Sequence, residues 1–161
     1  MIVDAMTSLN STVSSGLVDR FSTLAARVRE LAALLSEEQF WQKPFPFGNS
    51  FGHLVLHLTG NLNYYIGAQI AASGYVRDRD REFTDAHPPV KEEALTRFDA
   101  AVARVLEELR AQSEEDWSKP YTAKGLENAG SRFNAILNCV THLHHHIGQM
   151  MYLNFELTRK K

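Results

Sequence analysis

The sequence predicts an all-α protein, specifically a four-helix bundle. Four segments carry apolar residues at steps of three and four positions, which places them on one face of a helix. Segments containing proline or glycine separate them, and no useful length of chain alternates apolar and polar residues as a half-buried strand does. Amphipathic helices bury their apolar faces against one another, and 161 residues suffice for one core. We therefore expect residues 1–161 to form a single domain.

The first expected helix ends before a short helical turn. Arg27 and Glu30 fall outside its apolar stripe. Ser36, followed by acidic residues, is typical of the N-cap of a further short helix. Pro44 and Pro46 then interrupt helical hydrogen bonding, because proline has no backbone N–H. The apolar stripe comprises Leu17, Phe21, Leu24, Val28, Leu31 and Leu35.

The second expected helix leads into a long connection. Gly48-Asn49-Ser50 supplies its N-terminal cap, and the apolar pattern runs to about Ser73-Gly74. Residues 75–90 are polar and end in Pro88-Pro89, followed by Val90. This composition predicts a long crossover between the two halves of the chain.

The third and fourth expected helices complete the bundle. The third follows the crossover, and the fourth runs from about Ser131 to about Leu157. The order is thus helix–turn–helix, a crossover, then helix–turn–helix. The third stripe contains Leu95, Phe98, Val102, Val105 and Leu109, and the fourth contains Phe133, Ile136, Val140, Leu143, Ile147 and Met150.

Composition excludes several classes of function. The formal net charge is −2, which provides no surplus of cations for neutralising nucleic-acid phosphates. No run approaches 18 apolar residues, so we expect no membrane span. The N-terminus has no positive segment before an apolar core, as a secretory signal would. The single cysteine, Cys139, has no internal partner for a disulfide and fits a reducing compartment, so we expect a cytoplasmic protein.

Histidine is the residue type that points to chemistry. Six of the seven histidines lie on the second and fourth expected helices. Neutral imidazole is the commonest transition-metal ligand, and residues four apart on a helix share a face. A catalytic zinc-type site uses three protein ligands, so a pair on one helix needs a third from another. The six histidines are His53, His57, His142, His144, His145 and His146.

Spacing orders these candidates without deciding between them. His142 and His146 precede the stripe residues Leu143 and Ile147, which favours this pair. His145 could instead pair with His142 at a spacing of three. A purely structural role for the histidines is the competing interpretation.

Two motifs resemble those of a known family. Residues 49–61, Asn-Ser-Phe-Gly-His-Leu-Val-Leu-His-Leu-Thr-Gly-Asn, resemble the second-helix motif of DinB-like (YfiT-like) proteins. Residues 142–149 resemble the family's fourth-helix motif, His-x-x-x-His-x-Gly-Gln. The resemblance covers nearly the whole chain. It implies an up–up–down–down bundle with a long middle crossover and a three-histidine metal site, in which nickel or zinc is the usual ion. Its ligands fall on His57, His142 and His146, while His53 is a surplus histidine near them.

The resemblance also implies a class of activity. Characterised relatives include thiol-dependent transferases and a mycothiol-dependent maleylpyruvate isomerase, and others are described as metal-dependent hydrolases. We therefore expect a divalent-metal-binding enzyme, a thiol-dependent S-transferase or a hydrolase, acting on a small-molecule or thiol substrate as a homodimer. A bundle that binds metal or a small ligand without catalysis is the alternative.

Other polar residues have less certain roles in this scheme. Asn61, one turn after His57, and Gln149, three residues after His146, can orient a ligand or substrate, or can simply satisfy their own hydrogen bonds. No carboxylate stands beside the expected ligands in sequence, which argues against hydrolysis with a protein general base. Residues 77–82 alternate in charge. We expect a self-neutralising loop there, with a position at the mouth of the site or in a dimer contact as the alternatives.

Overall fold

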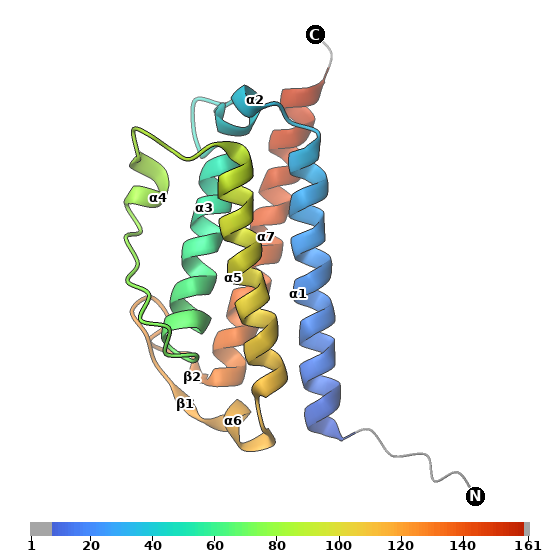
Figure 1. Cartoon of the computed structure of the whole chain (residues 1–161), viewed down its shortest axis with the longest axis vertical. Helices are drawn as coiled ribbons and strands as arrows, with labels where there is room; N and C mark the ends of the chain where they lie inside the picture. The colour runs from blue at the N-terminus through green and yellow to red at the C-terminus, as the bar shows by residue number, and fades with distance from the viewer. Residues whose placement is uncertain (1–7, 160–161) are drawn as a thin grey trace, which may run out of the picture.

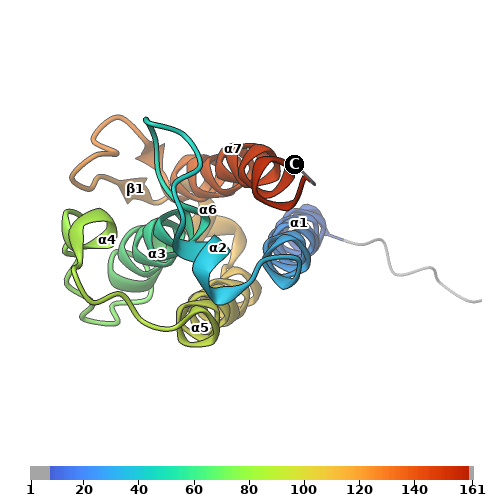
Figure 2. The ribbon, with the colours of Figure 1, turned by 90° about the horizontal axis from the view of Figure 1, so that it is seen from above.

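Four long helices dominate the computed structural model, which describes residues 8–159. They are α1 (Leu9–Ala33), α3 (Phe51–Leu62), α5 (Lys91–Ala111) and α7 (Arg132–Thr158). Figure 1 shows them side by side along the long axis, and Figure 2 shows them arranged around a common centre. The predicted all-α bundle is therefore confirmed.

The helix directions differ from those that the resemblance implied. Helices α1 and α7 run in the same direction, since Arg20 faces His144 at one level and Leu31 faces Asn154 further along both. Helices α3 and α5 both run the opposite way (Figure 1). In chain order the bundle is therefore up–down–down–up rather than up–up–down–down. The physical reason is that each connection within a half is short enough to reverse the chain, whereas the crossover returns along the full length of the bundle.

The core contains the apolar stripes read from the sequence. Four side chains from α1, α5 and α7 are each 0% exposed: Phe21, Phe98, Leu143 and Met150. Leu58 of α3 is equally buried and meets them at the centre. Burying a side chain of this size contributes about 1.5–3 kcal/mol. The stripes therefore supply the main stabilisation of the bundle.

Short elements make the connections at the ends of the bundle. Helices α2 (Glu37–Trp41) and α6 (Glu114–Ser118) each begin with a capping box, in which a serine and the residue three positions later satisfy each other's backbone N–H groups. Strands β1 (Pro120–Tyr121) and β2 (Gly130–Ser131) form one small antiparallel pair before α7. Helix α4 (Arg81–Thr84) is a single turn within the crossover.

The second expected helix ends earlier than its apolar pattern suggested. The α-helix stops at Leu62 and continues as a π-helix, η1 (Asn63–Ala68). The chain then leaves the helix, with positive φ angles of 51° at Ala72 and 75° at Gly74. A π-helix is wider than an α-helix and is frequent at functional sites. The predicted boundary at residues 73–74 therefore marks the end of the following turn.

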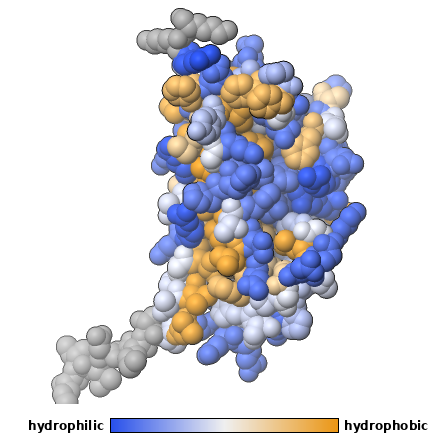
Figure 3. Space-filling model, turned by 180° about the vertical axis from the view of Figure 1, so that it is seen from behind, coloured by the Kyte–Doolittle hydropathy of each residue, from blue (hydrophilic) through white to orange (hydrophobic). Residues whose placement is uncertain are grey.

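The face at the back of the molecule in the view of Figure 1 is partly apolar. On this face apolar side chains gather in more than one place (Figure 3). Exposed large apolar residues on α7 include Leu137, Met151 and Phe155.

The homodimer expected from the resemblance stays a prediction. Within residues 8–159, no helix is both long and apolar enough to cross a membrane.

Candidate metal centre

Three histidine rings converge between α3 and α7. His57 comes from α3, and His142 and His146 come from α7. One ring nitrogen of each lies within 4.8 Å of those of the other two. The Nε2 atoms of His57 and His142 are 3.0 Å apart, and the ring centre of His146 lies 5.0 Å from that of His57 and 4.4 Å from that of His142. The structure thus brings together the three predicted ligands.

The local sequence explains why these rings meet. Ser50 caps α3, whose antiparallel contact with α7 sets the level of His57 against the pair on the facing helix. On α7, Leu143 is 0% and Ile147 3% exposed, so the buried stripe fixes the rotation of the helix. His142 and His146, which directly precede these two residues, are then both turned toward α3, as their spacing of four predicts.

A carboxylate from the crossover holds the ring of His57. Glu82 of α4 is 7% exposed, and its Oε2 lies 2.8 Å from Nδ1 of His57. Arg77 donates to the same carboxylate, from Nε to Oε1 at 2.7 Å and from Nη2 to Oε2 at 3.0 Å. Because a carboxylate paired with a guanidinium is ionised and only accepts hydrogen bonds, the Nδ1–H of His57 donates to Glu82. The Nε2 lone pair of His57 then faces the other two rings, as in carboxylate–histidine–metal arrangements.

The close approach of Glu82 depends on a glycine. A Cβ atom added to Gly60 of α3 would lie 2.0 Å from Oε1 of Glu82 and 3.3 Å from Nε of Arg77. No side chain fits in that space. Gly60, which belongs to the second-helix motif, therefore lets the crossover reach the ring of His57.

An amide from α7 itself holds the ring of His146. Its Nδ1 lies 2.7 Å from Oε1 of Gln149, so the ring donates through Nδ1 and its Nε2 carries the lone pair. That Nε2 atom is buried and has no hydrogen-bond partner among the described residues. Gln149 thus contacts a candidate ligand, and its role in orienting that ring stays a prediction.

The environment keeps the α7 rings neutral. Burial, with the neighbouring rings of His146 and His57, lowers the pKa of His142 to about 3. Burial also lowers the pKa of His146, against the opposing effect of its bond to Gln149. Histidine must be neutral to bind a metal ion, so both rings are in the ligand form at neutral pH.

The geometry fits a divalent transition metal ion. Nitrogen lies about 2.0–2.1 Å from such an ion, so two nitrogens on one ion are separated by about 3 Å. The 3.0 Å between the Nε2 atoms of His57 and His142 matches this value. An ion at this point would also satisfy the orphaned Nε2 of His146. Three nitrogens from two helices leave further coordination positions open.

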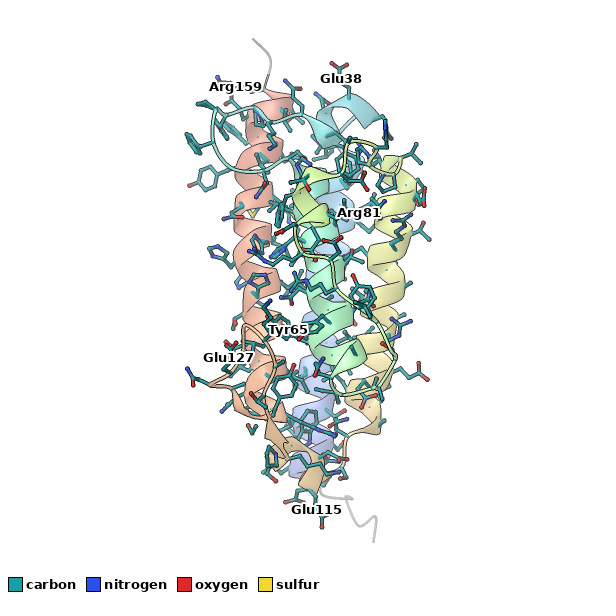
Figure 4. The ribbon with its side chains drawn as sticks, turned by 90° about the vertical axis from the view of Figure 1, so that its left-hand side faces the viewer. Glu38, Tyr65, Arg81, Glu115, Glu127 and Arg159 are labelled. Carbon is teal, nitrogen blue, oxygen red and sulfur yellow. The ribbon has the colours of Figure 1, made fainter. Side chains whose placement is uncertain are left out.

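A cavity of about 520 Å³ opens beside the rings. The Oδ1 atom of Asn61, one of its lining residues, is buried without a hydrogen-bond partner in the described part of the chain. Tyr65, on the π-helix, donates from its hydroxyl to the carbonyl of Lys124 at 3.1 Å and lies beside the loop that carries Glu127 (Figure 4). The full lining is His57, Asn61, Tyr64, Tyr65, Arg77, Arg79, Lys124, Gly125 and His142.

The remaining histidines of the two helices lie outside the cluster. The Nδ1 atom of His53 lies 2.8 Å from the hydroxyl of Ser50 in the α3 capping box. His144 contacts Arg20 of α1 through its Nδ1 at 3.3 Å. His145 touches the ring of His146 without joining the three nitrogens, so the alternative pairing of His145 with His142 is not formed.

Glu82 and Arg77 are the residues that sequence reasoning missed. No carboxylate was expected beside the ligands, yet Glu82 is hydrogen-bonded to one of them. Arg77 and Glu82 do neutralise each other, as expected of residues 77–82, but they do so within the site. The alternative interpretation of residues 77–82, a position at the mouth of the site, is the one that would have pointed to Arg77 and Glu82.

Fold and site together define a four-helix-bundle protein with a three-histidine candidate metal centre. The family model of the DinB superfamily matches residues 20–150, and the chain belongs to this superfamily. Its fold is similar to that of a conserved protein from Enterococcus faecalis, with a TM-score of 0.74 and 17% sequence identity. That similarity covers 91% of this chain and 98% of the other. No curated protein matches the sequence.

Proposed function

We propose that this protein binds one divalent transition metal ion, zinc or nickel, through His57, His142 and His146, and is a metal-dependent thiol transferase. The observation that carries the proposal is the convergence of three ring nitrogens within 4.8 Å, one of them buried and unpartnered. When bound, such an ion lowers the pKa of a thiol or of water at an open coordination position. Membership of the DinB superfamily supports the same assignment.

The surrounding residues favour a thiol over water as the nucleophile. Hydrolysis commonly uses a free carboxylate as general base. Both oxygens of Glu82 are already bonded, Oε1 to Arg77 and Oε2 to His57 and Arg77. None of the described residues that line the cavity is acidic. Glu82 therefore orients His57 and is poorly placed to take a proton from substrate, whereas a thiol of low pKa needs no such base.

The protein's own groups have defined parts in this proposal. Glu82 and Gln149 hold two rings so that their Nε2 atoms face one point. The buried amide of Asn61 offers a hydrogen bond to substrate beside the rings. The cavity, about 520 Å³, is large enough for a small-molecule thiol.

Metal analysis tests the binding step. We expect untagged protein to hold one zinc or nickel ion per chain, measured by mass spectrometry of the elements after dialysis. The His57→Ala variant should lose the ion, and His144→Ala, outside the cluster, should keep it. Equal metal content in wild type and in a variant lacking all three cluster histidines would refute the proposal.

A substrate screen tests the chemistry. Metal-loaded protein is given glutathione, bacillithiol or mycothiol with an electrophile, and in parallel ester and amide substrates. We expect thiol consumption that His57→Ala abolishes and His144→Ala retains. Turnover of esters or amides without any thiol would instead assign a hydrolase, and a metal-loaded protein without turnover would assign a binding protein.

A further inference from the structure

The cavity beside the histidines has a cationic lining. Arg77, Arg79 and Lys124 all line it, and no acidic residue of the described chain does. Arg77 lies in the irregular part of the crossover and Arg79 in the turn that leads into α4, and both line the cavity. Asp78 between them turns elsewhere and accepts from the backbone N–H of Arg81 at 3.2 Å. Within residues 77–82, Arg77 and Arg79 thus line the cavity, whereas Arg81 pairs with Asp85 and Glu82 is bonded to His57 and Arg77.

Two of the three cations are free to meet a ligand. Arg77 is bonded to Glu82, which offsets its charge. Neither Arg79 nor Lys124 has a carboxylate within 4.0 Å in residues 8–159, and both are exposed. Glu127 is the nearest acidic group on the Lys124 loop, and its Oε1 accepts from the backbone N–H of Gly125 at 2.8 Å. This hydrogen bond from Gly125, and Lys124 to a smaller extent, lower the pKa of Glu127, but Glu127 is not part of the lining, which thus carries more positive than negative charge.

The guanidinium of Arg79 is held near the histidines, and the backbone that carries Lys124 is held beside the cavity. The guanidinium of Arg79 lies 5.8 Å above the ring of Phe83, and that ring lies 5.1 Å from the ring of His57. The backbone of Lys124 is fixed because its carbonyl accepts from the hydroxyl of Tyr65. A cation that is held in place loses less freedom on binding than a mobile one, so the position of Arg79 suits recognition of an anion.

A buried amide gives an independent sign of a ligand. Asn61 is 6% exposed, lines the same cavity, and its Oδ1 has no hydrogen-bond partner in the described chain. A buried polar atom without a partner is costly and rare, and a bound molecule is one way of satisfying it. The cavity thus presents charge at its mouth and an unmet hydrogen bond beside the rings.

We infer that the cavity binds a small-molecule substrate through its anionic group, a carboxylate or a phosphate, held by Arg79 and Lys124. The rest of the substrate extends toward Asn61 and the histidines. Charge-assisted hydrogen bonds to the two cations supply affinity and orientation. This inference rests on the proposed function, because it takes the three histidines as the reacting end of the cavity.

Calorimetry with simple anions tests the inference in metal-free and in zinc-loaded protein. The probes are succinate, glycerol 3-phosphate and the neutral succinamide. The test variant is Arg79→Gln/Lys124→Gln, and the matched control is Arg27→Gln/Arg97→Gln, which removes two exposed cations elsewhere. Zinc content is measured on every sample, with His57→Ala as the variant that lacks the ion.

We expect one of the two anions to bind wild type and the control variant alike, and the test variant about tenfold or more weaker. Its affinity should fall with added salt, and succinamide should not distinguish the variants. The stronger anion identifies the recognised group. Equal anion affinity in wild type and in the test variant, with zinc bound to both, overturns the inference alone. A wild-type protein that binds no zinc but binds the anion more tightly than the test variant does overturns the proposed function alone.

Discussion

Replacing Glu82 by glutamine tests how far the crossover controls the metal centre. Removing the outer hydrogen-bond partner of a metal-bound histidine typically weakens metal binding by about 10- to 100-fold. The glutamine amide keeps an acceptor for Nδ1–H of His57, which Glu82 now contacts at 2.8 Å, but loses the charge. We therefore expect zinc affinity to fall about tenfold for Glu82→Gln and nearer 100-fold for Glu82→Ala.

The same substitution leaves a buried cation without its partner. The Arg77 side chain is 9% exposed and donates two hydrogen bonds to the carboxylate of Glu82. Breaking a buried ion pair on one side costs about 3–5 kcal/mol. Arg77 lines a cavity that water can enter, so we expect the lower end, about 3 kcal/mol. For a chain of this length that corresponds to a fall of roughly 10 °C in Tm.

The assay separates the two effects. Zinc affinity is measured by competition with a chromogenic chelator, and the Tm of metal-free protein by circular dichroism. The matched control is Glu93→Gln, which removes an exposed carboxylate paired with Arg97. Its Tm should change by less than about 4 °C, because exposed pairs contribute about 0–1 kcal/mol. Wild-type zinc affinity together with an unchanged Tm in Glu82→Gln would refute this account of the site.

Three further predictions concern Gly60, His142 and the core residue Phe98. Gly60→Ala places a Cβ 2.0 Å from a Glu82 oxygen, so we expect its free energy of unfolding, measured in urea, to fall by about 1–3 kcal/mol and its zinc binding to weaken. The control is Gly148→Ala, whose added Cβ meets no neighbouring side chain within 4 Å and which should be neutral or stabilising. In metal-free protein the pKa of His142 is lowered to about 3, so the unfolded chain binds a proton that the folded one refuses, and the free energy of unfolding should fall as pH drops from about 6.5 toward 3. His142→Gln should flatten that fall in urea titrations across pH, and an unchanged slope would contradict the assignment. Phe98→Ala, at a fully buried position, should cost about 3–5 kcal/mol, and a loss below about 1 kcal/mol would show that this core can collapse around the vacancy.

Local periodicity was enough to predict much of the fold and of the candidate ligands. The stripe of α7 fixes which side of the helix is buried, and His142 and His146 follow from it by position. Gln149 lies three residues after His146 on the same helix, so its contact with that ring also follows from helical spacing. The choice of His57 over His53 did not follow from spacing, since both lie on one face of α3. It came from the resemblance, and the structure shows its cause in the capping role of His53.

Contacts made by the crossover could not be predicted in this way. Glu82 lies 25 residues from His57 and reaches it through an irregular segment, for which no periodic rule gives a direction. The early end of α3 was missed for a related reason, because the π-helix retains an apolar pattern while changing its hydrogen bonds. Helix direction also depended on the connections rather than on the stripes. Spacing thus predicts partners within a helix, whereas partners across loops need coordinates.

The helices and the loops contribute different parts of the site. The three rings stand on α3 and α7, within the packed bundle, while Arg79 and Lys124 stand on the crossover and on the loop between β1 and β2. Exposed loops accept insertions and exchanges far more readily than packed helices do. Substitutions at Arg79 and Lys124 would therefore change the charge and shape of the molecules that the cavity accepts, while Glu82 and Arg77 of the same crossover keep the ring of His57 in place.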